Sequence, residues 1–231
     1  MNRKALKTVF LDTVPVLTGY LFLGMGFGIL LFEKTGYGIG WSLCMSLFML
    51  AGSGQYLAVS LIADHASIIS AAIATFLVNA RHIFYGISLI EPYKGAGKKK
   101  PYLIYALTDE TYSLVTQNEP PEGMKRHTYC FLVSLLDHSY WVIGTALGSI
   151  LGATLPISFE GVEFVLTALF VTMFVEQWLT HKNHIPAVIG VGATVLCLML
   201  FGKDVFLIPS MVMIAILLTI SRKTGRRTGD V

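Results

Sequence analysis

Polar side chains interrupt several long apolar stretches of this sequence. Burying a polar side chain in an apolar environment costs free energy unless it gains a hydrogen-bond or charge partner. The first interruption is Gly52-Ser53-Gly54-Gln55, inside an apolar run from about residue 39 to 63. Glycine weakens a helix by up to about 1 kcal/mol relative to alanine, so we expect a membrane helix broken near its middle. Unwound backbone at this depth is tolerated where it lines a cavity, and transporters commonly bind substrate at such breaks. The stretch therefore predicts part of a substrate-binding site.

A second interruption, Asn79-Ala80-Arg81-His82, lies in the C-terminal half of the apolar run from about residue 66 to 90. An arginine in a membrane helix either faces the interior of the helix bundle or snorkels to an interface. Both interpretations of Arg81 stay open. In the first, Asn79 is a substrate ligand, while Arg81 and His82 take part in coupling or gating.

Carboxylates interrupt the sequence in two further places. Asp109 and Glu110 lie at the centre of segment 102–115, which is too short for a simple span and could be a short buried, re-entrant or interfacial helix. Because Thr108 suits a helix start, these two acids either face the helix dipole or bind a coupling proton. Asp137 adjoins a histidine in another apolar run, where the pair could relay a proton or be satisfied within a crowded core.

The composition shows which elements must position these residues. The 231-residue chain is 54% hydrophobic and 13% charged, with a mean hydropathy of +0.66, which indicates a helical membrane protein. We predict an all-α polytopic bundle of seven or eight spans, with at least one broken helix, forming a single transmembrane domain over residues 1–231. The predicted spans are about residues 9–32, 39–63, 66–90, 128–155, 162–179, 185–201 and 205–220, with 102–115 as the uncertain eighth.

Small and basic residues add detail to this bundle. Glycines spaced four apart, at 24 and 28 and again at 144, 148 and 152, predict faces where helices approach closely. Short basic clusters beside the apolar runs fit the positive-inside bias better than nucleic-acid binding. The three cysteines show no metal-ligand spacing, so we expect them to pack as small core residues. We expect no metal, no cofactor and no nucleic-acid partner.

The sequence also contains a weak internal repeat. At a constant offset (177 − 55 = 122), Gln55-Tyr56-Leu57 aligns with Gln177-Trp178-Leu179. This alignment predicts a repeat of about three spans and makes Gln177 a substrate-binding candidate opposite Gln55, since secondary transporters often bind substrate between repeats. Whether the repeat is parallel or inverted depends on whether segment 102–115 crosses the membrane. The predicted halves are about residues 9–90 and 128–221, with 91–127 linking them.

Three of these stretches, in order along the chain, resemble a known family. The likeness rests on Ala51-Gly52-Ser53-Gly54-Gln55, on Asn79-Ala80-Arg81-His82 with Tyr85, and on Leu107-Thr108-Asp109-Glu110-Thr111. They are similar to the signature stretches of AzlC-type branched-chain amino acid permeases. The resemblance implies a bacterial inner-membrane exporter of valine, leucine and isoleucine. It also implies a partner, a small AzlD-like membrane protein.

A secondary transporter is the function we favour. Freed amides at Gly52–Gln55 suit a substrate carboxylate, and Gln55, Asn79 or Gln177 could accept from its ammonium group. His82, Asp109, Glu110 or Asp137 could bind a coupling proton. The chain has no GxxxxGK[ST] loop, so we expect transport driven by an ion gradient rather than by ATP. The alternatives are an intramembrane enzyme, for which HExxH and GxSxG are missing, or a non-transporting subunit.

Overall fold

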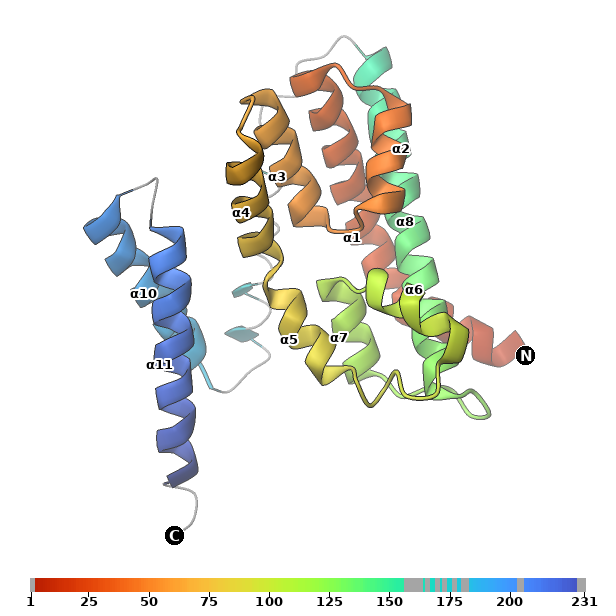
Figure 1. Ribbon diagram of the computed structural model, residues 1–231. Helices are drawn as coiled ribbons and strands as arrows, with labels where there is room; N and C mark the ends of the chain where they lie inside the picture. Colours follow the sequence, from red (N-terminus) through yellow and green to blue (C-terminus); the bar gives the residue numbers. More distant parts are fainter. Residues whose placement is uncertain are drawn as a thin grey trace. The chain divides into compact units, whose positions relative to one another are not determined.

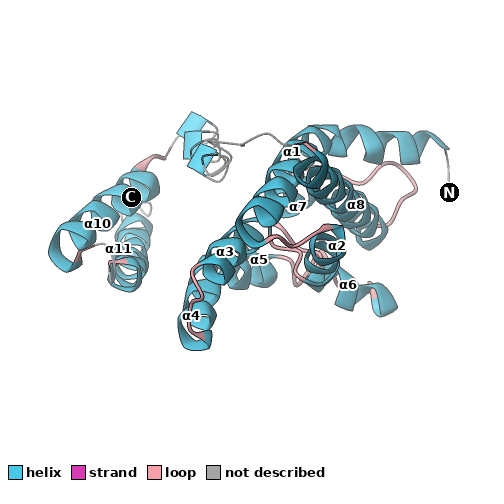
Figure 2. Ribbon diagram, turned by 90° about the horizontal axis from the view of Figure 1, so that it is seen from above, coloured by secondary structure: helices cyan, strands magenta, loops and turns pink. Residues whose placement is uncertain are grey.

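The computed structural model describes residues 3–155, 183–202 and 206–227, together with isolated residues between 164 and 179. Every described element is a helix, which confirms the all-α prediction (Figures 1 and 2). The chain divides into two units, Met1–Leu166 and Thr167–Val231. The helices are α1 (Arg3–Thr35), α2 (Ile39–Phe48), α3 (Gly52–Ala63), α4 (Ile68–Asn79), α5 (Arg81–Ser88), the short 3₁₀ helix η1 (Gly97–Lys99), α6 (Lys100–Tyr105), α7 (Asp109–Gln117), α8 (Arg126–Thr154), α10 (Ile185–Phe201) and α11 (Leu207–Arg227).

Helices α1 and α8 form the centre of the first unit and run parallel. Near the start of both helices, the Tyr129 hydroxyl donates to Asp12 at 2.9 Å. Farther along, a Cβ added to Gly148 would lie 2.1 Å from the Met25 carbonyl oxygen, and one added to Gly28 would lie 2.4 Å from backbone atoms of α8. The predicted close-packing faces are therefore confirmed, and it is the missing side chains that let the two backbones touch.

Helices α2 and α3 form a hairpin whose two arms pack against the α1–α8 pair. Its tip is residues 49–51, and both helices extend from the tip toward the same end of the unit (Figure 1). The Ser46 hydroxyl of α2 donates to Thr145 of α8 at 2.8 Å, and the Tyr56 hydroxyl of α3 donates to the Leu23 carbonyl of α1 at 2.7 Å. Thr145 and Leu23 lie at the same level of the parallel pair, so α2 and α3 occupy one half of its length.

This hairpin changes one sequence prediction. The break itself is confirmed, because α2 ends at Phe48 and α3 begins at Gly52. The expectation of one crossing from about residue 39 to 63 is wrong. Hydroxyls on α2 and α3 reach partners on α8 and α1 only when both half-helices lie along the same half of the α1–α8 pair, and irregular backbone at the tip is then buried in protein.

Helices α6 and α7 form a second hairpin that enters from the opposite end. Next to the start of α6, the Lys99 amine lies 5.0 Å from the centre of the Phe131 ring, early in α8. At the far end of α7, Arg126 donates to the Asn118 carbonyl oxygen at 2.7 Å. Both ends of this hairpin therefore lie beside the beginning of α8, and its tip is residues 106–108. Segment 102–115 thus forms two short helices joined by a tip, which favours the re-entrant interpretation among the alternatives that the sequence left open.

Helices α4 and α5 form a bent element with a change of direction of 44° at their break. Within the described residues, two helices are long and apolar enough to cross a membrane, α1 and α8, and a third crossing results if α4 and α5 are counted as one. Seven or eight spans and the internal repeat are not confirmed. Most of the predicted span 162–179 lies outside the described residues, while α10 and the apolar part of α11 are shorter helices.

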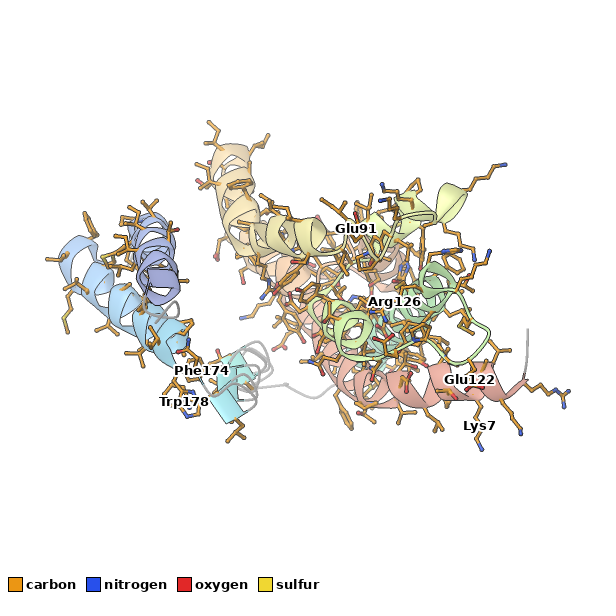
Figure 3. All side chains as sticks on the ribbon, turned by 90° about the horizontal axis from the view of Figure 1, so that it is seen from below. Lys7, Glu91, Glu122, Arg126, Phe174 and Trp178 are labelled. Atoms are coloured by element: carbon orange, nitrogen blue, oxygen red, sulfur yellow. The ribbon has the colours of Figure 1, made fainter. Side chains whose placement is uncertain are left out.

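Basic residues gather at one end of the first unit. The starts of α1 and α8 and the residues around η1 lie there, because Val9, Tyr93 and Tyr129 belong to one buried cluster. Figure 3 looks onto this end, with Lys7 and Arg126 labelled. The positive-inside rule predicts that this end faces the cytoplasm. The basic residues concerned are Arg3, Lys4, Lys7, Lys94, Lys98, Lys99, Lys100, Lys125 and Arg126.

Single-cysteine labelling in whole cells tests this arrangement. In a cysteine-free background, Gly38→Cys and Asp64→Cys should both react with a membrane-impermeant maleimide added outside, because the α2–α3 hairpin leaves the membrane on the side where it enters. Lys98→Cys and Glu122→Cys should react only after the cells are opened. A continuous crossing over residues 39–63 would instead put Gly38 and Asp64 on opposite sides, and that result would refute the hairpin.

Candidate functional site

The two hairpin tips meet at Arg81, the first residue of α5. One guanidinium nitrogen, Nη2, donates to the Ser53 hydroxyl at 2.9 Å and lies 2.8 Å from Asp109 Oδ2. Ser53 is in the first turn of α3, and Asp109 is the first residue of α7. The first amides of a helix have no partner within it and carry the positive end of its dipole. Three helix N-termini therefore converge on this point.

The ion pair at this point is largely buried. The Arg81 side chain is 28% exposed and that of Asp109 is 12% exposed. Arg81 thus faces the interior of the unit, which supports the first of the two sequence interpretations over snorkelling. Asp109 Oδ1 is buried and makes no hydrogen bond within the described part of the chain. One carboxylate oxygen is therefore left for a further donor.

Asn79 lies beside the ion pair, at the end of α4. Its amide nitrogen donates to the Thr75 carbonyl oxygen at 2.9 Å, while Oδ1 has no partner among the described residues. A Cβ added to Gly54 would lie only 3.2 Å from the Asn79 amide nitrogen, so the glycine allows α3 and α4 to approach closely. Asn79 is therefore well placed to accept from a ligand. His82 bonds instead to the Asn79 carbonyl oxygen, at 3.0 Å from Nδ1.

Gln55 is fully buried, and both ends of its amide are engaged. Its Oε1 accepts from the Trp141 indole nitrogen at 2.8 Å, and its Nε2 donates to the Met49 carbonyl oxygen at 3.0 Å. The side chain thus ties the first turn of α3 to the hairpin tip and to α8. This geometry favours a structural role over the predicted ligand role. Its proposed counterpart, Gln177, lies outside the described residues.

Replacing Gln55 by alanine should therefore lower stability more than it lowers substrate affinity. The variant leaves the buried indole N–H unpaired, which costs about 1–3 kcal/mol, and it removes one of the two hydrogen bonds to the Met49 carbonyl, which keeps its bond from the Ala51 nitrogen. Thermal unfolding in detergent measures the loss, with Gln117→Ala on the exposed face of α7 as a matched control. An unchanged melting temperature combined with lost substrate binding would make Gln55 a ligand.

The α7 N-terminus connects the site to two buried carboxylates. The Thr108 hydroxyl accepts from the Thr111 backbone nitrogen at 3.2 Å, which confirms the predicted cap. The Tyr20 hydroxyl lies 2.7 Å from both Thr108 Oγ1 and Glu110 Oε2, and the Thr111 hydroxyl donates to Asp137 Oδ2 at 2.7 Å. Glu110 and Asp137 thus belong to one network.

Sequence reasoning did not identify two aromatic residues of the site. Tyr20 and Trp141 look like ordinary aromatic residues within apolar spans. Their rings pack edge to face with centroids 5.3 Å apart, between the two hairpin tips. Only the packing of α1 on α8 brings them together, so local sequence carries no signal for their role.

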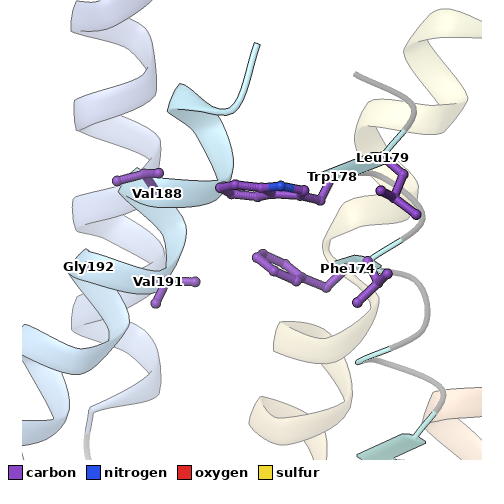
Figure 4. Close-up of a pocket in the computed structure, with 8 residues that line it drawn as sticks. Phe174, Trp178, Leu179, Val188, Val191 and Gly192 are labelled. Carbon is purple, nitrogen blue, oxygen red and sulfur yellow. The ribbon is translucent and has the colours of Figure 1, made fainter. Parts of the chain in front are cut away.

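A separate apolar pocket occurs in the second unit. It is lined by Phe174, Trp178, Leu179 and Val188, among others (Figure 4). The Trp178 ring stacks on His184 with centroids 4.2 Å apart. The described residues that line it are largely apolar.

Comparison with known proteins gives the chain its family. The family described as AzlC protein matches residues 15–155. The chain belongs to the AzlC family. It is 40% identical to the branched-chain amino acid transport protein AzlC of Bacillus subtilis, over 95% of this chain and 86% of that protein. No solved structure matches it.

Other relatives of this AzlC-family chain are named as membrane proteins. An uncharacterized membrane protein of Helicobacter pylori (strain ATCC 700392 / 26695) is 40% identical over 95% of this chain and 96% of that protein. The inner membrane protein YgaZ of Escherichia coli is 25% identical over 86% of this chain and 81% of that protein. These names and the apolar helices agree on a membrane protein. The family match over 15–155 includes both hairpins and Arg81.

Proposed function

We propose that this AzlC-family protein is a secondary-active exporter of branched-chain amino acids in the bacterial inner membrane. The name of the Bacillus subtilis relative supports the substrate class. The single observation that carries the proposal is the Arg81–Asp109 ion pair at the meeting point of two re-entrant hairpins. Partly buried charges are rare within membrane proteins and commonly mark substrate or ion pathways.

This ion pair is complementary to a zwitterion. An amino acid carries one carboxylate and one ammonium group, so each can take the place of one half of the pair. The carboxylate binds Arg81 and the free amides at the start of α3, where the helix dipole favours an anion. The ammonium group binds Asp109 and Asn79, each of which has a buried Oδ1 without a hydrogen-bond partner among the described residues. Arg81 and Asp109 are then substrate ligands as well as gating residues.

The aliphatic side chain of the substrate then lies among the apolar residues at the hairpin tips. Leu50 and the Trp141 ring are buried there. Gly52 packs against the same ring, and a Cβ added at Gly52 would lie only 3.1 Å from it. Such a surface holds valine, leucine and isoleucine with little discrimination, because one methylene changes affinity by only about 1–3 kcal/mol. Proton coupling and a small AzlD-like subunit complete the proposal.

Flux measurements in proteoliposomes test this function. Vesicles containing the full chain, alone or with a candidate small membrane partner, are loaded with labelled valine. Efflux is then recorded with and without a pH gradient. Gradient-dependent efflux that unlabelled leucine or isoleucine inhibits supports the proposal. A folded protein that moves none of the three amino acids, with or without the partner, refutes it.

A further inference from the structure

A continuous chain of hydrogen bonds joins the two carboxylates of the α7–α8 region. It runs from Glu110 to Tyr20, from Tyr20 to Thr108, from Thr108 to Thr111 and from Thr111 to Asp137. The oxygen–oxygen distances are 2.7, 2.7, 3.0 and 2.7 Å in that order. Each link is short enough for a hydrogen bond between oxygen atoms. Three hydroxyl groups therefore connect two carboxyl groups without a gap.

Counting hydrogens fixes the protonation of this chain. Its four links need four hydrogens. Tyr20, Thr108 and Thr111 supply one each, because a hydroxyl carries a single hydrogen. The fourth must come from a carboxyl group. With both carboxyls ionised one link is lost, and with both protonated two hydrogens point at each other somewhere along the chain. A fully bonded chain holds one proton on Glu110 or on Asp137.

The two ways of placing this proton are mirror arrangements of the same chain. In one, protonated Glu110 donates to Tyr20, and the hydroxyls donate onward to ionised Asp137. In the other, protonated Asp137 donates to Thr111, and the hydroxyls donate back to ionised Glu110. To pass from one arrangement to the other, the protonated carboxyl gives its proton to the neighbouring hydroxyl, and each hydroxyl gives its own hydrogen to the next oxygen. The carboxyl at the far end therefore becomes protonated. No oxygen atom moves, and the total charge stays the same.

We propose that Glu110 and Asp137 share one transferable proton through Tyr20, Thr108 and Thr111, and that this proton couples the substrate site to the pH gradient. The burial of the two ends supports this use. Asp137 is 1% exposed, and its Oδ1 makes no hydrogen bond within the described residues, whereas Glu110 is half-buried beside the substrate site. The coupling role rests on the proposed function, but the shared proton does not.

Neighbouring charges connect the proton to the substrate. Asp109 adjoins Glu110 on α7, and Arg81 of α5 faces Asp109. A substrate ammonium bound at Asp109 brings positive charge close to Glu110, which favours ionised Glu110 and sends the proton to Asp137. Other titratable groups surround this region. His138 bonds Tyr102 of α6 and the Ser46 carbonyl of α2, and Asp12 of α1 bonds Tyr129. Tyr85 of α5 stacks on Tyr112 and also faces Asp109 and Glu110.

Interrupting the chain at its buried end tests the coupling role. Thr111→Val removes one hydroxyl and keeps the side-chain shape, Thr111→Ser restores the hydroxyl, and Thr116→Val is the control on the exposed face of α7. Valine–valine exchange needs no net proton movement, whereas gradient-driven efflux does. We expect Thr111→Val to lose roughly tenfold or more of the gradient-driven rate while it keeps exchange, and Thr111→Ser to recover it. Gradient-driven efflux equal to that of Thr116→Val would overturn the coupling role.

Infrared spectroscopy of the purified full chain tests the shared proton without any transport. We expect a protonated-carboxyl stretching band near neutral pH that disappears in the Glu110→Gln/Asp137→Asn double variant. It should amount to one carboxyl group. Absence of the band from the folded wild type would overturn the shared proton. A band without valine flux would support it and refute only the proposed function.

Discussion

Replacing Arg81 by glutamine should abolish valine transport. The substitution removes the hydrogen bond to Ser53 and the 2.8 Å contact to Asp109, and leaves that carboxylate buried without its partner. Breaking one side of a buried ion pair costs about 3–5 kcal/mol. It also removes the group that we assign to the substrate carboxylate. Since about 1.4 kcal/mol corresponds to a tenfold change, affinity for valine should fall by about a hundredfold or more.

Two further variants separate charge from geometry at this position. Arg81→Lys keeps the positive charge but loses the planar fork that reaches two partners at once, so it should recover only part of the affinity. Lys98→Gln removes one positive charge from the exposed basic end and should bind valine like the wild type. Valine binding to purified protein is measured by calorimetry, after circular dichroism has shown that each variant is folded. Wild-type affinity in Arg81→Gln would exclude Arg81 from the site.

The broken backbone at residues 49–51 could be predicted from sequence because its cause is local. Gly52 and Gly54 weaken a helix wherever they occur, and Thr108 before two acids favours a helix start in any context. Local rules of this kind also predicted a close-packing face on each of α1 and α8, although not that these two faces pack on each other. Each of these features depends on residues within one or two turns of each other.

The path of the chain after the break could not be predicted in the same way. An apolar run from about residue 39 to 63 has the same hydropathy whether it crosses the membrane or folds back halfway. The choice depends on distant partners, such as the bond from Ser46 to Thr145 and the bond from Tyr56 to Leu23. For the same reason the sequence pointed to Gln55 as a ligand, because its partner Trp141 is far away along the chain.

The repeat illustrates a different limit. The match of Gln55 to Gln177 suggested a pair of glutamines across one cavity, but Gln55 bonds Met49 in its own half and Trp141, rather than Gln177, in the other half. The described first unit instead contains two hairpins that enter from opposite ends and meet at their tips. Their sequences share little beyond a leucine two residues before each helix start, Leu50 and Leu107. The two hairpins have similar backbone paths, but their sequences differ too much for an alignment at a constant offset to detect the similarity.

The spacing of α1 and α8 underlies the whole site, so Gly28→Ala should be strongly destabilising. A Cβ at this position would lie 2.4 Å from the Thr145 carbonyl oxygen and from the Ser149 nitrogen, both backbone atoms of α8. A helix backbone cannot yield locally as a flexible side chain does, so the two helices must separate. Overpacking typically costs about 1–3 kcal/mol, and a clash with backbone should lie at or above the upper end of that range.

Gly19 provides the matched control, because it lies on the same helix and a Cβ added there meets nothing within 4 Å. Gly19→Ala should be neutral or should stabilise the protein by up to about 1 kcal/mol, since alanine favours helix more than glycine does. Thermal unfolding in detergent compares the two variants directly. Equal melting temperatures would show that α1 and α8 do not touch at Gly28. Tyr20 would then no longer be held within reach of Thr108 and Glu110, and the proton chain between Glu110 and Asp137 would lose its support.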